Sequence, residues 1–201
     1  MSPPSTDRAE RRRELTEVAA RVIARKGYAA ARLSDVADEA GVSIGLLQHY
    51  FRSRDALMRE AFSLVWSHQL DELASIVSTD APAVVRLDSV LEWLFPDDPR
   101  SAVAESSLTL EYWMTATRDP ELRKESQTIY LRWRETLQGL FEDGAASGEF
   151  HPRVPLDEAA DGMLALIEGL MIRLLLRHPG IAPAGVRKIV RNHAAAVLGF
   201  G

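Results

Sequence analysis

The chain has 201 residues, no cysteine and a formal net charge of −5. This length allows one large domain or two small ones, and the lack of cysteine excludes disulfides, thiolate chemistry and cysteine zinc sites. No signal peptide is visible, and the most apolar run, residues 163–176, is broken by Glu168 and Arg173 and is too short to span a bilayer.

We therefore expect a cytoplasmic protein with no membrane partner, and we expect residues 1–6 to form a disordered tail. The first helix follows and opens with four arginines, Arg8, Arg11, Arg12 and Arg13. Residues 1–60 contain 11 Lys+Arg against 9 Asp+Glu, a net +2, whereas residues 61–201 contain 13 against 20, a net −7. An arginine cluster near a terminus is by itself ordinary solvated surface, but beside a DNA-binding element it indicates attraction to phosphates.

Two short helices with a tight turn between them are expected over residues 33–50. The first, residues 33–40, has one apolar face at helical spacing, formed by Leu33, Val36, Ala37 and Ala40. Gly41 follows where a helix end needs a left-handed residue. Ser43 has the hydroxyl that caps the N-terminus of the next helix.

The second short helix, residues 44–50, is anchored inward by Leu47 and Phe51. Its outer surface carries no acidic residue, as approach to phosphates requires. That surface consists of Ile44, Gly45, Leu46, Gln48, His49 and Tyr50. Ser53 caps the helix that comes next. The segment predicts a helix-turn-helix whose second helix enters the major groove of DNA.

Other interpretations of this segment remain open. Residues 41–45 fit the G-x-S-x-G elbow of hydrolases, but that motif needs a strand before it, and here an amphipathic helix is expected. A helical hairpin without a DNA role is the second alternative. The histidines have no ligand spacing such as H-E-x-x-H, and no Gly-rich phosphate loop is present, so we expect no enzyme, no cofactor and no metal site.

Beyond residue 60 the chain is expected to be helical, because no alternating strand pattern occurs. Prolines and glycines mark the breaks, and later helices are expected at about 99–117, 120–147, 156–178 and 183–198. We predict an all-α chain of roughly nine helices. An N-terminal three-helix DNA-binding domain would cover residues 1–52, and a C-terminal helical ligand-binding and dimerisation domain residues 53–201.

The helix expected over residues 156–178 is apolar on nearly all sides, so one face needs a partner outside its own domain. We predict a two-fold homodimer through a four-helix bundle made by the last two helices of each chain. A single chain that buries both faces is the alternative. The residues expected at the interface are Gly162, Leu166, Gly169, Leu170, Val186, Ile189, Val190, His193 and Val197.

Residues 11–66 resemble the TetR family of transcriptional regulators. The matching features are the basic first helix, Gly27-Tyr28, residues 35–37 and 40–43, the Tyr50-Phe51 pair and residues 53–57. The resemblance implies DNA contacts from Ser43, Ile44, Leu46, Gln48, His49 and Tyr50, and phosphate contacts from Arg32 and Arg54. The chain departs from the family in having Ala31-Arg32 where many members have a Thr pair, and Gln48 where a Tyr is frequent.

Residues 44–51 and the C-terminal part resemble the BetI-type branch, whose best-known members respond to choline. The matching C-terminal segments are residues 95–98, 119–122, 148–150 and 165–170. The resemblance implies a ligand-responsive dimeric repressor that a small molecule releases from a palindromic operator in double-stranded DNA. A helical small-molecule-binding or scaffold protein without a DNA role is the alternative.

The helix expected over residues 99–117 scatters polar groups among large apolar ones, which indicates a helix that lines a cavity. Aromatic residues on the helices that line the family's pocket, together with Glu111 or Glu105, would suit a cationic effector through cation–π attraction. Ordinary core packing is the alternative for each aromatic. The candidate ligand residues are Trp66, Trp93, Leu108, Glu111, Tyr112, Trp113, Tyr130 and Trp133.

Overall fold

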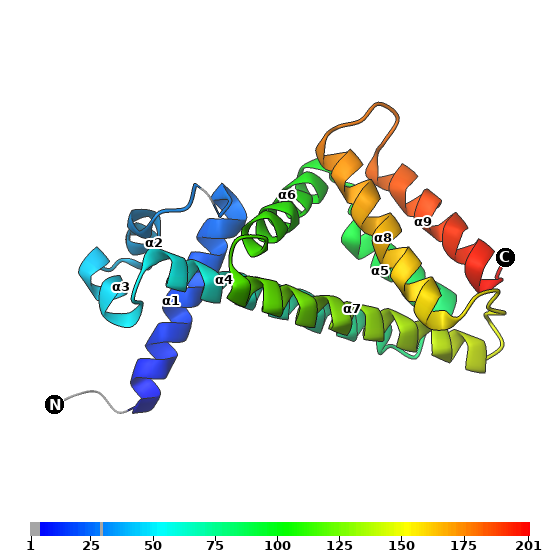
Figure 1. Ribbon diagram of the computed structural model, residues 1–201, viewed down its shortest axis with the longest axis horizontal. Coiled ribbons are helices and arrows are strands. Elements are labelled where there is room, and N and C mark those ends of the chain that lie inside the picture. The colour runs from blue at the N-terminus through cyan, green and yellow to red at the C-terminus, as the bar shows by residue number, and fades with distance from the viewer. Residues whose placement is uncertain (1–4, 29) are drawn as a thin grey trace. The chain divides into compact units, whose positions relative to one another are not determined.

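The computed structural model describes residues 5–28 and 30–201, without the side chains of residues 5–7 and 99–106. Within these residues the chain forms nine α-helices and no strand, which confirms the all-α prediction (Figure 1). The helices are α1 (Ser5–Lys26), α2 (Leu33–Ala40), α3 (Ile44–Tyr50), α4 (Arg54–Val77), α5 (Ala83–Leu94), α6 (Pro99–Ala116), α7 (Pro120–Ala146), α8 (Leu156–Leu175) and α9 (Pro183–Leu198).

The helices form two compact units. The N-terminal unit contains residues 1–68 and 111–125, and the C-terminal unit contains residues 69–110 and 126–201. The limits of these units fall inside α4, α6 and α7, so these three helices contribute to both. The domain boundary expected at residue 52 stays a prediction.

Two helix ends differ from expectation. Ser5 begins α1 although a tail was expected to extend through residue 6; the first four residues of that tail lie outside the described part. Leu175 ends α8, three residues before the expected end. Arg177 adopts a φ of 51°, a left-handed conformation that cannot continue a helix.

Apolar faces of α1 to α4 supply most of the core of the N-terminal unit, and Tyr112 of α6 and Leu122 of α7 are buried in the same unit. The side chains from residues 15–62 named next are at most 4% exposed, and this burial is the main favourable term in the folding of the unit. The core residues are Leu15, Ala19, Val22, Ile23, Val36, Ala37, Leu47, Phe51, Leu57, Met58, Ala61 and Phe62.

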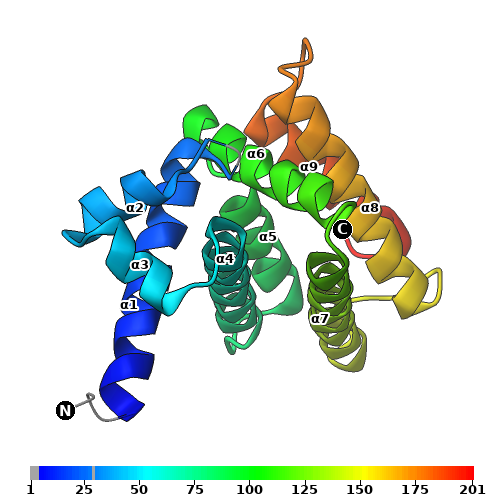
Figure 2. The same cartoon turned by 60° about the vertical axis from the view of Figure 1, so that its left-hand side comes forward.

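The core of the C-terminal unit is built from α4, α5, α7, α8 and α9. α8 and α9 lie side by side (Figure 2). α9 also packs on α5, where Arg191 forms an ion pair with Asp88 at 2.9 Å. Among the described residues, no helix is long and apolar enough to cross a bilayer.

Candidate DNA-binding and effector sites

The turn between α2 and α3 has the geometry that the sequence predicts. Gly41 adopts the left-handed conformation (φ 64°, ψ 35°), and the Val42 N–H donates back to the Ala37 carbonyl at 2.9 Å. Ser43 has extended backbone, and its Oγ accepts from the Leu46 N–H at 3.2 Å. Because a helix precedes Ser43, its hydroxyl is an N-cap rather than the nucleophile of a hydrolase elbow.

α3 separates an inner from an outer face. Leu47 and Phe51 are 0% and 2% exposed and fix the helix to the core. The outer face contains the predicted DNA residues, of which Ile44, Gly45, Gln48 and His49 are exposed and Leu46 and Tyr50 partly so. These residues therefore share a surface, as expected, and their contacts with bases stay predictions.

Basic residues of α1 neutralise the acidic face of α2. Arg25 binds Glu39 at 2.5 Å and Lys26 binds Asp35 at 2.7 Å. The hydrogen bond from Arg25 lowers the pKa of Glu39, and the hydrogen bond from Lys26 lowers the pKa of Asp35. The acidic charge next to α3 is thereby compensated within the unit.

Arg12 holds the end of α3 rather than standing free at the surface. Its guanidinium donates to the Tyr50 carbonyl at 2.5 Å, forms an ion pair with Glu60 and lies 4.6 Å from the centre of the Phe51 ring. The hydrogen bond with Glu60 raises the pKa of Arg12. Among the arginines of the N-terminal cluster, Arg12 thus has a structural role that the sequence did not indicate.

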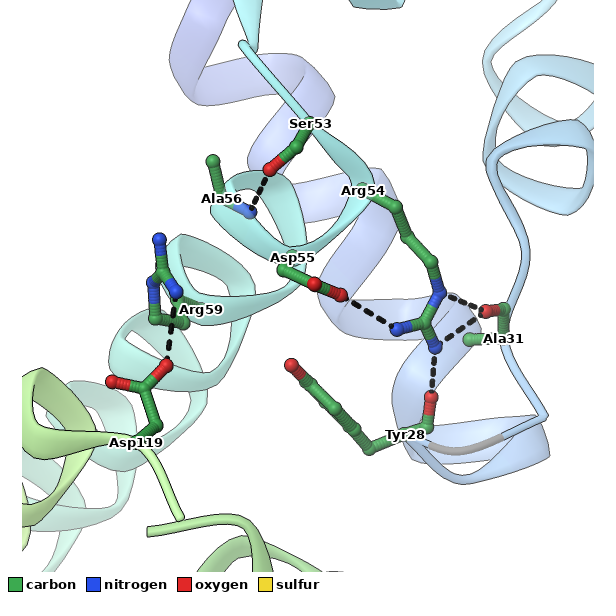
Figure 3. A network of polar contacts seen from close by, with 8 residues as sticks. All are labelled: Tyr28, Ala31, Ser53, Arg54, Asp55, Ala56, Arg59 and Asp119. Carbon is green, nitrogen blue, oxygen red and sulfur yellow. Dashed lines mark hydrogen bonds and ion pairs between the residues drawn. The ribbon is translucent and has the colours of Figure 1, made fainter.

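Arg54 is bound inside the N-terminal unit (Figure 3). Its Nε and Nη2 donate to the Ala31 carbonyl at 3.0 and 2.8 Å, and Nη2 also donates to the Tyr28 carbonyl at 2.5 Å. A direct phosphate contact from Arg54 stays a prediction, but the structure gives this side chain a positioning role in the α1–α2 connection. Arg32, by contrast, is exposed.

Glu111 binds the same connection from α6. Its Oε2 accepts from the Tyr28 N–H at 2.5 Å, and a Cβ added at Gly27 would lie 3.0 Å from both carboxylate oxygens. The φ of +81° at Gly27 favours glycine, and any larger residue there would also require the Glu111 carboxylate to shift. Sequence reasoning noticed Gly27-Tyr28 but missed this contact, because the partner lies 83 residues away.

The candidate ligand residues fall into two groups. Trp66, Glu111, Tyr112 and Trp113 belong to the N-terminal unit; Trp93, Leu108, Tyr130 and Trp133 belong to the C-terminal unit. In the first group the rings of Trp66 and Tyr112 lie 5.2 Å apart, and in the second those of Trp93 and Trp133 are stacked at 5.8 Å. The side chain of Glu105 is outside the described part of the chain.

In the second group, Trp93 and Tyr130 already have polar partners. The Trp93 indole N–H donates to Glu72 at 3.0 Å, and the Tyr130 hydroxyl donates to Asp161 at 3.1 Å. Burial and the hydrogen bond with Asp161 raise the pKa of the Tyr130 hydroxyl.

The expected dimer residues do not all face outward. Leu170, Val186 and Val190 are at most 5% exposed and lie in the core of their own chain, so their assignment to a dimer surface is not supported. Leu166 and Val197 pack partly against that core, and His193 is half-buried. Gly162, Gly169 and Ile189 are exposed.

The glycine turn, the serine N-cap and the outer face of α3, which carries no acidic residue, define a helix-turn-helix DNA-binding protein. Residues 15–61 match the family described as bacterial regulatory proteins, tetR family, and residues 83–199 match the C-terminal domain of BetI-type transcriptional repressors. The chain belongs to the TetR family of transcriptional regulators and carries a BetI-type C-terminal domain. It is a DNA-binding transcriptional repressor rather than an enzyme.

Related proteins cover almost the whole chain. The regulator BetI of Burkholderia pseudomallei (strain K96243) is 30% identical over 94% of this chain and 93% of its own length. The regulator PksA of Bacillus subtilis is 25% identical over 97% and 93%. A transcriptional regulator from Saccharomonospora viridis, solved in complex with choline, has a TM-score of 0.80 and 29% identity over 92% of this chain and 96% of its own.

Proposed function

We propose that the protein is a homodimeric repressor that leaves a palindromic operator when a small organic cation binds to its regulatory helices. The observation that carries this proposal is the surface of α3, where the exposed face has no acidic side chain and the opposite face is buried in the core. A bacterial regulator that binds operator DNA would act in the cytoplasm.

The outward face of α8 supports the homodimer. Its exposed small and apolar residues follow one another at alternating spacings of three and four positions, the spacing of helices that pack along their length. They are Gly162, Ala165, Gly169 and Ile172, and Leu176, which directly follows the helix, continues the series. A Cβ on Gly162 or Gly169 would meet no atom within 4 Å, so the small-residue strip faces open space.

α9 has a similar strip. Gly185, Ile189, Asn192 and Ala196 are exposed or partly exposed at spacings of four, three and four positions. Two α8–α9 pairs related by a two-fold axis would bury both strips in a four-helix bundle. The two copies of α3 would then meet successive major grooves about 34 Å apart, which requires a palindromic operator.

The choline complex of the Saccharomonospora viridis regulator supports a cationic effector. This chain has two aromatic pairs, Trp66–Tyr112 and Trp93–Trp133, whose ring faces attract an organic cation. The net charge of −7 on residues 61–201 also attracts a cationic rather than an anionic effector.

α6 supplies a route from effector to DNA. It begins in the C-terminal unit and ends in the N-terminal unit, where Glu111 accepts from the Tyr28 N–H. A cation that prefers a dimer with widely spaced α3 helices lowers operator affinity by the difference between its affinities for the two states. A shift of α6 would reach the α1–α2 connection through Glu111.

The test is fluorescence anisotropy with labelled DNA from the promoter upstream of its own gene, at several salt concentrations. We expect binding that weakens with salt, is lost in Gln48→Ala and falls when choline is added. Gln138→Ala on α7 is the matched control and should bind as the wild type does. Equal binding by Gln48→Ala would contradict the assignment of α3, and no response to choline or other quaternary ammonium ions would contradict the effector class.

A further inference from the structure

One buried polar group of the N-terminal unit has no partner among the described residues. Trp66 on α4 is 6% exposed, and its Nε1 is buried without a hydrogen-bond acceptor. A buried N–H that lacks an acceptor is unfavourable, because it has lost its water and gained nothing in exchange. Arg86 Nε shares this condition, but other atoms of that guanidinium bind Val77 and Asp143.

The surroundings of Trp66 are aromatic. Its ring lies against Tyr112 at 5.2 Å; Tyr112 in turn meets the edge of Phe62 at 5.4 Å, and Phe62 stacks on Tyr28 at 4.6 Å. The Tyr112 hydroxyl is 3.4 Å from the Leu122 carbonyl and does not accept from the indole. The unpaired Trp66 N–H therefore lies beside aromatic ring faces that suit a cation.

Burial raises the pKa of the Tyr112 hydroxyl, and the charge of Glu125 raises it further. Glu111, the acidic residue expected from the sequence, instead binds the Tyr28 N–H.

We propose that the Trp66 indole N–H donates to an oxygen of the effector, which is an organic cation that carries a hydroxyl or carboxylate a short chain away from its charge. The tryptophan N–H can only donate, so the ligand atom it meets must be an acceptor. The ring faces of Trp66 and Tyr112 attract the cationic end. This inference rests on the proposed function, because it assigns part of the effector site.

Three quaternary ammonium probes distinguish the parts of the ligand. Choline has a hydroxyl, glycine betaine has a carboxylate, and ethyltrimethylammonium is choline with its hydroxyl replaced by hydrogen. By calorimetry on the full-length protein, ethyltrimethylammonium should bind about tenfold more weakly than choline, the ratio expected for one hydrogen bond. Comparison of choline with betaine shows which oxygen acceptor is preferred.

Trp66→Phe should reduce the choline preference to about one, because it removes the N–H and keeps an aromatic ring. Gln138→Ala on α7 is the control, since Gln138 is exposed, bonds to Glu142 and lies outside both aromatic pairs, and it should keep the tenfold preference. If the wild type binds choline and ethyltrimethylammonium with equal affinity, the role of the Trp66 N–H is overturned, but the proposed effector class is not. No binding of any probe would overturn the proposed effector class as well.

A crystal structure of the wild-type protein with choline tests the inference even if Trp66→Phe does not fold. The choline oxygen should lie within hydrogen-bond distance of Trp66 Nε1. A choline molecule elsewhere, or an ordered water bound to that nitrogen, would overturn the assignment.

Discussion

Arg54 ties the first turn of α4 to the connection between α1 and α2. The fork of its guanidinium spans two carbonyls, those of Tyr28 and Ala31, and the cation also lies 5.1 Å from the centre of the Tyr28 ring. A lysine ammonium cannot reproduce this geometry, because its donors are not held in a planar fork. Arg54 thereby fixes the backbone of Ala31, directly before the exposed Arg32, although the two arginines lie on opposite sides of α3 in the sequence.

Replacing Arg54 by Lys should destabilise the protein by about 2 kcal/mol, the magnitude of a hydrogen bond to a charged group. Denaturant unfolding followed by circular dichroism measures this loss. Arg52→Lys is the matched control, because Arg52 is exposed, and it should leave the unfolding midpoint unchanged. Equal stability of the two variants would show that the Arg54 hydrogen bonds contribute nothing.

Substitutions at Glu111 test whether this residue couples effector binding to operator binding. Glu111→Ala removes the acceptor of the Tyr28 N–H, whereas Glu111→Gln keeps an acceptor oxygen without the charge. If Glu111 transmits the shift of α6, operator binding by the alanine variant should respond at least about fivefold less to choline, and the glutamine variant should be intermediate.

Choline affinity, measured separately by calorimetry without DNA, decides between two roles for Glu111. A positioning residue that only contacts Tyr28 should leave the choline Kd nearly unchanged when it is replaced. A large rise in that Kd would instead return Glu111 to the ligand site that the sequence suggested.

At the scale of helices, α2 and α3 could be predicted because their signals are local. An apolar stripe, a left-handed glycine and a serine N-cap each act within a few residues. The contacts of Arg54 and Glu111 could not be predicted, because a polar side chain on a half-buried surface has no periodic signal. The apolar side chains of Leu170 and Val190 predicted that both residues are buried. They could not show whether the covering helix belongs to the same chain or to a second copy.

α3 contains a glycine that the free protein does not need. The nearest atom to a Cβ added at Gly45 would be the Ser43 Oγ, at 3.8 Å, and the φ of Gly45 is not positive. Gly45→Ala should therefore stabilise the protein by roughly 0.5–1 kcal/mol, because alanine is the better helix former. Thermal unfolding measures this gain.

The same variant should bind operator DNA at least about tenfold more weakly if Gly45 allows close approach to the duplex. Anisotropy titration measures this affinity, with the more stable fold ruling out misfolding as the cause. Unchanged affinity would place Gly45 away from the DNA surface.

The ion pairs between α1 and α2 make the N-terminal unit sensitive to acid. The pKa values of Glu39 and Asp35 are lowered by their hydrogen bonds with Arg25 and Lys26, so these carboxylates bind fewer protons in the folded than in the unfolded chain. These carboxylates contribute to the free energy of unfolding at pH values above their pKa in the unfolded chain, about 4. The contribution is lost as pH falls through their lowered pKa values in the folded chain. Urea unfolding at pH 6 and pH 3 should show a smaller acid-induced loss in Glu39→Gln than in the wild type.

At the scale of the whole molecule, operator binding requires two copies of α3, so the dimer is a condition for function. Gly169 lies on the exposed strip of α8, where no atom of its own chain is within 4 Å of an added Cβ. Gly169→Glu should therefore leave the monomer folded but put a charge into the four-helix bundle. Gly139 on α7 also has nothing within 4 Å, and Gly139→Glu is the matched control.

Sedimentation velocity at micromolar concentration should show a dimer for the wild type and Gly139→Glu, and a monomer for Gly169→Glu. Because each monomer presents one α3, the monomeric variant should also lose operator affinity while it keeps its helical circular dichroism spectrum and its choline binding. A dimeric Gly169→Glu would move the interface away from α8, and a monomeric variant with full operator affinity would remove the need for a palindrome.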